Sequence, residues 1–196
     1  MHRDVLEMLS ATLPDQGSRE IERQLGRVKY TAPTLTDSRA EGNGFPSFLE
    51  PFLWWLGEHG VIPTPMQHLG LYFAQHPKLS NGIRPGLEAR LLRAWPSLVR
   101  DYHLLALVRE AGMIVTYSGN FDKAGIDLTV WPTLPDRPPL FVHAFVSSDR
   151  SAGFREGKVR GPRHFDLPLD PAEARVVGNV WLYQSPLHTE RVRAAL

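Results

Sequence analysis

The side chains with the types and spacing to do chemistry lie in the second half of the chain, around Asp127. Asp127 stands in an apolar stretch, where an acid is costly to bury unless a cation or a hydrogen bond compensates it. His143 follows in a second apolar stretch, and Arg155 and Lys158 follow in a basic one. Phosphodiester hydrolysis uses these types, because it needs a held cation and positive groups that offset developing charge. The alternative is a structural carboxylate at a strand end, hydrogen-bonded to a turn.

A basic segment stands out in a chain that is otherwise balanced. The chain has 22 Lys and Arg against 21 Asp and Glu, for a formal net charge of +1, yet residues 150–163 hold five basic residues against the single acid Glu156. Such a concentration is typical of a phosphate-binding patch, and a solvated helix face is the alternative. The residues that we expect to contact nucleic acid are Arg150, Ser151, Arg155, Arg160 and Arg163, with a helix cap as the alternative role of Ser151.

A metal site in this chain must be built without thiolates, since it has no cysteine. We expect Asp127 and His143 as ligands, with Asp122 from the preceding turn as a third. Mg²⁺ prefers oxygen ligands, whereas Mn²⁺ or Zn²⁺ accepts an imidazole more readily. The alternatives are a core histidine with one hydrogen bond at 143 and a solvated hairpin acid at 122.

The elements that must position these residues follow from hydrophobic spacing. Residues 87–94 and 98–108 have helical periods on either side of Trp95-Pro96-Ser97, which we expect to interrupt the helix. Three extended stretches follow at 113–117, 126–131 and 140–146. A polar helix over 149–160, a strand over 175–183 and a closing helix after Pro186 complete the order α, β, β, β, α, β, α, with 163–166 as a surface loop.

The first half of the chain is predominantly helical in its pattern. Two short amphipathic helices fit residues 4–29, with a break at 13–18 and Ser18 as an N-cap. Residues 30–46 have no apolar period and predict a loop, and further helices fit 46–58 and 66–75. We therefore divide the chain into an N-terminal helical region, 1–85, and an α/β core, 86–196.

This order of elements resembles the core of the restriction-endonuclease-like PD-(D/E)XK phosphodiesterases over residues 87–183. The resemblance implies an α/β (α+β) fold with an αβββαβ core, in which Asp127 matches the metal-binding acid of the second strand. Glu88 matches the acid that the leading helix supplies in some members, and a solvent-facing ion pair is its alternative role. The third strand departs from the pattern, because it offers His143 and neither the expected acid nor the expected lysine. Lys158 on the following helix would replace that lysine, as in some members of the family.

The resemblance implies a nuclease that uses Mg²⁺ or Mn²⁺ to hydrolyse DNA. Asp127 would then bind the metal, Lys158 would stabilise charge, and His143 and Glu88 would assist. The alternatives are a catalytically degenerate module that binds nucleic acid or assembles with protein, and a small-molecule enzyme of unrelated fold. The N-terminal helices would recognise substrate or form a homodimer. We expect a cytoplasmic protein without a membrane partner, since the sequence has no secretory signal and no apolar run of spanning length.

Overall fold

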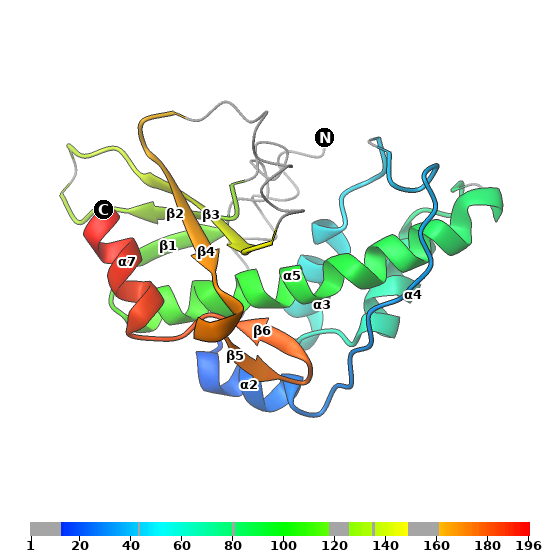
Figure 1. The fold of residues 1–196 in the computed structure, drawn as a ribbon, viewed down its shortest axis with the longest axis horizontal. Helices are drawn as coiled ribbons and strands as arrows, with labels where there is room; N and C mark the ends of the chain where they lie inside the picture. The colour runs from blue at the N-terminus through cyan, green and yellow to red at the C-terminus, as the bar shows by residue number, and fades with distance from the viewer. Residues whose placement is uncertain (1–12, 43, 80, 118–125, 135, 149–160) are drawn as a thin grey trace.

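The computed structural model describes residues 13–42, 44–79, 81–117, 126–134, 136–148 and 161–196. These residues form a mixed α/β structure in which one long helix runs through the molecule (Figure 1). Before the strands come α2 (Ser18–Leu25), α3 (Leu49–His59), α4 (Pro65–Gln75), the short 3-10 helix η1 (Asn81–Ile83) and the long helix α5 (Arg84–Glu110). After the sheet come a second 3-10 helix, η3 (Pro171–Glu173), and the closing helix α7 (Leu187–Ala195).

Helix α5 is continuous over 27 residues and contains Pro96, so the predicted interruption at 95–97 is wrong. A proline inside a helix removes one main-chain hydrogen bond. Here the apolar face continues across it, because Trp95 and Val99 are fully buried on either side. The indole Nε1 of Trp95 also donates to the carbonyl of Pro63 at 2.9 Å. The stabilisation from burying this face therefore outweighs the cost of the missing main-chain hydrogen bond.

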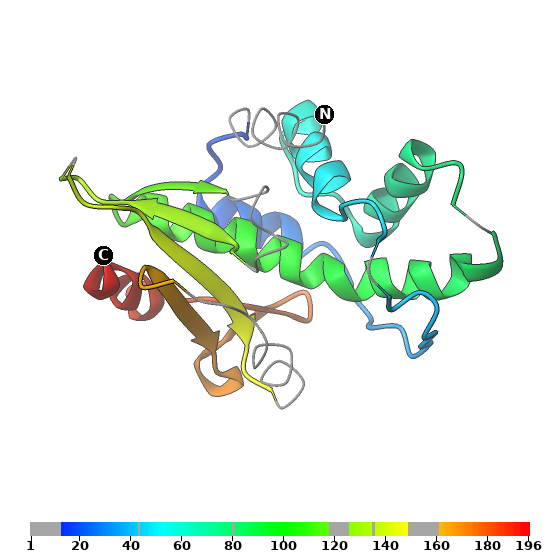
Figure 2. The same cartoon turned by 90° about the horizontal axis from the view of Figure 1, so that it is seen from above.

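The main sheet has the strand order β1-β2-β3-β4. The strands β1 (Ile114–Tyr117), β2 (Leu128–Trp131) and β3 (Leu140–Val146) are antiparallel neighbours, which confirms the three predicted strands. The fourth strand, β4 (His164–Leu169), pairs with β3 in parallel. One face of the sheet packs against the C-terminal half of α5, and Figure 2 shows this layering from above.

Strand β4 occupies the segment that was predicted as a surface loop, and that prediction is wrong. Its alternation buries Leu167 and Leu169 and leaves Pro168 exposed, which suits an edge strand. The strand predicted over 175–183 is instead a separate hairpin of β5 (Arg175–Val177) and β6 (Val180–Leu182). Its two-residue turn, Gly178-Asn179, has φ values of 55° and 64°. Positive φ at both turn positions is the type I′ geometry that closes tight hairpins.

The predicted helices within 18–29, 46–58 and 66–75 are confirmed by α2, α3 and α4, and the one after Pro186 by α7. Gly17, rather than Ser18, is the N-cap of α2. The described residues between α2 and α3 hold no helix or strand, as predicted for the loop 30–46. The first predicted helix and the predicted helix 149–160 lie outside the described residues.

The main apolar core is shared by both halves of the chain. Its members include Ile21, Phe52 and Leu56 from the helical half and Val142 and Leu167 from the sheet. A smaller cluster joins the N-terminal half of α5 to α4. Among the described residues, no helix is long and apolar enough to cross a bilayer.

Candidate functional site

Asp127 lies immediately before β2 and bonds to β3. Its main-chain N–H donates to the carbonyl of Val142 at 2.9 Å. Its carboxylate Oδ2 accepts the main-chain N–H of Ala144 at 2.6 Å. The carboxylate therefore helps to hold the two strands together, which is the structural role expected as an alternative.

His143 lies on β3 next to Ala144 and is brought to a second histidine on β4. Its Nε2 is 2.9 Å from Nδ1 of His164, and the two ring centroids are 5.1 Å apart. The parallel register sets His143 opposite Asp166. Because side chains alternate along a strand, His164 and Asp166 share the face of His143. The β3–β4 pair thus gathers two imidazoles and a carboxylate.

Sequence reasoning missed His164 and Asp166 because it treated their segment as a loop. The available signal was the alternation of these two polar residues with the apolar Phe165, Leu167 and Leu169. The strand was obscured by Pro168, whose missing N–H is tolerated only at a position such as this exposed one on an edge strand.

Beneath the sheet, α5 contributes a buried pair of charged residues that the sequence analysis also missed. Arg100 and Asp101 are only 7% and 6% exposed, and Arg100 Nε lies 3.6 Å from Asp101 Oδ1. Nearby, the Tyr183 hydroxyl donates to the carbonyl of Leu167 at 2.8 Å. Burial raises the pKa of Tyr183, Asp101 and Asp127 raise it further, and Arg100 opposes them. Asp101 and Asp127 therefore act on one buried phenol from the helix and from the sheet.

Glu88 is not brought to Asp127. It accepts a hydrogen bond from Arg84 Nε at 2.9 Å in an exposed pair on the first turns of α5. Its neighbours Leu87 and Leu91 pack into the smaller cluster beside α4, away from the sheet. Of the acids on α5, Asp101 is the one that acts, together with Asp127, on the buried hydroxyl of Tyr183.

Arg163 is the one residue of the predicted nucleic-acid contacts that the structure describes. Its guanidinium donates to the carbonyls of Pro138 at 2.9 Å, Pro139 at 3.4 Å and Leu196 at 3.3 Å. These bonds tie the start of β4 to the approach to β3 and to the C-terminal residue. The other predicted site residues outside the described part of the chain are Asp122, Arg150, Ser151, Arg155, Lys158 and Arg160.

The described residues do not by themselves make a Mg²⁺ site. Among them, no three His, Cys, Asp or Glu side chains are close enough to hold a metal ion together. The donors that do meet on the sheet are the imidazoles of His143 and His164, whereas Mg²⁺ demands near-octahedral oxygen ligation. This donor set fits an ion that accepts nitrogen better than it fits Mg²⁺.

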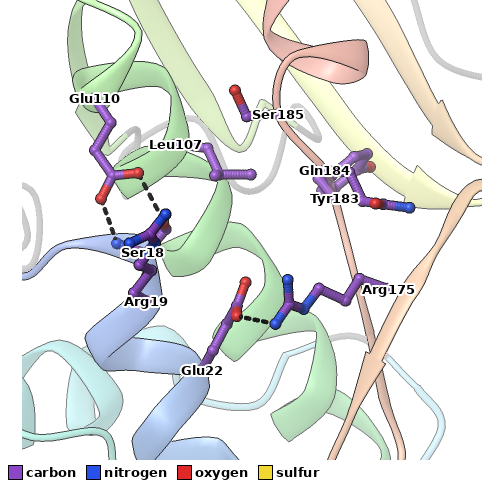
Figure 3. Close-up of a pocket in the computed structure, with 9 residues that line it drawn as sticks. All are labelled: Ser18, Arg19, Glu22, Leu107, Glu110, Arg175, Tyr183, Gln184 and Ser185. Carbon is purple, nitrogen blue, oxygen red and sulfur yellow. Dashed lines mark hydrogen bonds and ion pairs between the residues drawn. The ribbon is translucent and has the colours of Figure 1, made fainter.

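A separate pocket of about 360 Å³ lies between α2, the C-terminal end of α5 and the segment after β6 (Figure 3). Its carboxylates already have partners. Glu110 accepts bonds from the main-chain N–H and the hydroxyl of Ser18, and Glu22 pairs with Arg175 at 2.8 Å and with His103 at 3.3 Å. These bonds fasten α2 to α5 and β5, so the polar lining has a structural use.

Comparisons with protein-family models, curated proteins and solved structures return no match to this chain. Its class is therefore given by its own architecture, a mixed α/β structure with N-terminal helices, a long helix, a four-stranded mixed sheet and a C-terminal helix.

Proposed function

We propose that this protein is a divalent-metal-dependent nuclease with a restriction-endonuclease-like core, acting on DNA phosphodiester bonds. The observation that carries the proposal is the position of Asp127, at the start of β2 and bonded to β3, in a sheet that follows a long helix. A fourth strand, which follows the three antiparallel strands and pairs with β3 in parallel, supports the proposal.

In this proposal each described residue has a defined task. The Asp127 carboxylate, fixed by the Ala144 N–H, offers oxygen to a cation, which when bound would activate water and the scissile phosphate. The imidazole of His143, whose Nε2 lies 2.9 Å from Nδ1 of His164, would assist as a metal ligand or as a general base. Arg155 and Lys158 would contact the phosphate and offset its charge.

A second candidate function is nucleic-acid binding or protein assembly without catalysis. The observation that favours it is the third strand, whose own sequence holds His143 but no acid and no lysine. The use of Asp127 Oδ2 as an acceptor for the Ala144 N–H is compatible with a purely structural carboxylate.

Cleavage assays on the full chain separate the two functions. Wild type, Asp127→Asn and Asp127→Ala are incubated with single-stranded, duplex and branched DNA in Mg²⁺, Mn²⁺ or EDTA. Asp127→Asn keeps an acceptor for the Ala144 N–H and loses the charge, so it separates metal ligation from strand pairing. Asp136→Asn, an exposed acid between β2 and β3, is the matched control.

The nuclease proposal expects metal-dependent cleavage by wild type and Asp136→Asn, and a loss of about 10²-fold or more in both Asp127 variants. Salt-sensitive binding without cleavage by any of the four proteins would support the non-catalytic module. Absence of both cleavage and DNA binding would overturn the nuclease and the nucleic-acid-binding module.

A further inference from the structure

The histidine pair at the β3–β4 join has a geometry that strand pairing fixes. His143 Nε2 and His164 Nδ1 lie 2.9 Å apart on adjacent parallel strands. His143 is only 7% exposed, whereas His164 is partly exposed, so the pair spans the boundary between interior and solvent. The register places the two residues diagonally on one face of adjacent strands, so their side chains stay within reach of each other while the strands are paired.

This spacing matches two ligands of one octahedral metal ion. At metal–nitrogen distances of about 2.1 Å, two nitrogens 2.9 Å apart subtend an angle of roughly 90° at the ion. A tetrahedral ion would need roughly 3.4 Å between them. Each imidazole presents its lone pair at the facing nitrogen when its proton sits on the other ring nitrogen, so two neutral rings can bind an ion without releasing a proton.

We infer that His143 and His164 are neighbouring ligands of a first-row transition-metal ion such as Mn²⁺, Co²⁺ or Ni²⁺, in preference to Mg²⁺. The inference deepens the proposed function and rests on it for the role of the bound ion. Asp166 is the register partner of His143 and adds negative charge on the same face. Water or a phosphate oxygen would fill the remaining positions.

Ion binding is measured first on the full chain without nucleic acid. Ni²⁺ and Co²⁺ are titrated into wild type by calorimetry, with the visible absorption of Co²⁺ as a second readout. The test variants are His164→Gln and His143→Gln. The matched control is His59→Gln, an exposed histidine on α3. Far-UV circular dichroism and a thermal melt show that each variant is folded. His164 is partly exposed, so its substitution should disturb the packing of the core less than that of the buried His143.

We expect wild type to bind one Ni²⁺ per chain. The affinity for Ni²⁺ should fall at least about tenfold in His164→Gln and stay unchanged in His59→Gln. Millimolar Mg²⁺ should not displace it. Equal binding by wild type and His164→Gln would show adventitious binding elsewhere. No binding by wild type would show a hydrogen-bonded imidazole pair only. Either result overturns the inference.

The outcomes also separate this inference from the nuclease proposal. Ni²⁺ held by the pair without cleavage in any metal would leave the metal site standing and overturn the nuclease. Cleavage that runs in Mg²⁺ and is indifferent to His164→Gln would support the nuclease and overturn a catalytic role for the ion held by the pair.

Discussion

At the scale of single residues, the burial of His68 makes the stability of the fold depend on pH. Its Nε2 donates to the carbonyl of Phe48 at 2.8 Å, and its ring packs edge-on against Phe52. Burial lowers the pKa of His68 from 6.5 to about 4, and the bond to Phe48 opposes this shift. A pKa below the unfolded value means that the neutral ring favours folding above pH 6.5 and that this contribution is lost as the pH falls toward 4.

We therefore expect the titration of His68 to lower the free energy of unfolding by about 2–3 kcal/mol as the pH falls from 7.5 to 4.5. Urea denaturation at the two pH values measures this. His68→Gln can still donate to Phe48 and does not titrate, so its pH dependence should be smaller by that amount. The exposed His59→Gln should behave as wild type does, and equal pH dependence in all three proteins would contradict the prediction.

Gly178, in the turn between β5 and β6, is a second residue with a measurable role. Its φ is +55°, and an added Cβ would lie 2.5 Å from the carbonyl oxygen of Leu25 and 2.7 Å from that of Val28. Gly178→Ala would therefore push the hairpin away from the end of α2. Gly60 is the matched control, because it has φ +64° and nothing within 4 Å of an added Cβ.

Gly60→Ala should cost about 1 kcal/mol for its backbone conformation alone, and Gly178→Ala about 1–3 kcal/mol more. Chemical denaturation of both variants gives the difference. If the two substitutions cost the same, the close approach of the turn to α2 does not contribute to stability.

At the scale of elements, α2 is capped by a residue from another helix. The N-cap residue, Gly17, has no side chain that could cap the helix. Instead the carboxylate of Glu110 at the end of α5 accepts the Ser18 N–H at 2.7 Å and the Ser18 hydroxyl at 2.6 Å. A carboxylate at a helix N-terminus satisfies an otherwise unpaired N–H and faces the positive end of the helix dipole. The cap thereby couples α2 to α5.

Glu110→Ala should lower the free energy of unfolding by about 1–2 kcal/mol, measured by urea denaturation. Glu190→Ala removes an exposed carboxylate that pairs with Arg193 three residues on, and it should cost about 0.5 kcal/mol or less. A Glu110→Ala cost no larger than that of Glu190→Ala would show that the cap is energetically neutral.

The elements also show where sequence reasoning succeeds. Periodicity predicted β1, β2 and β3 because each buries a regular apolar set against α5. It missed β4, whose pairing with β3 is decided by a neighbour distant in sequence, and it overlooked the Gly178-Asn179 turn signal within 175–183. The candidate site shows the same limit. Asp127 and His143 stand out as polar residues in apolar strands, whereas His164 and Asp101 join them only through tertiary packing.

At the scale of the whole molecule, the predicted division at residue 85 falls inside a continuous packing arrangement. Helix α5 begins at Arg84, and its buried face touches both the N-terminal helices and the sheet. Phe52 from α3 and Leu167 from β4 are both fully buried in the same cluster. Removing either half would expose apolar side chains of α5 and of the shared core to water. The two halves should therefore unfold together.

Single side-chain substitutions, one in the helical half and one in the sheet, test whether the two halves unfold together. Phe52→Ala and Leu167→Ala should each cost about 2–5 kcal/mol, by the loss of buried area and the cavity left behind. If the core is one cooperative unit, each variant shifts a single urea transition, and tryptophan fluorescence and far-UV circular dichroism coincide. Two independent domains would instead give a biphasic curve in which Phe52→Ala moves one phase and Leu167→Ala the other, because each cavity would then lower only the stability of its own domain.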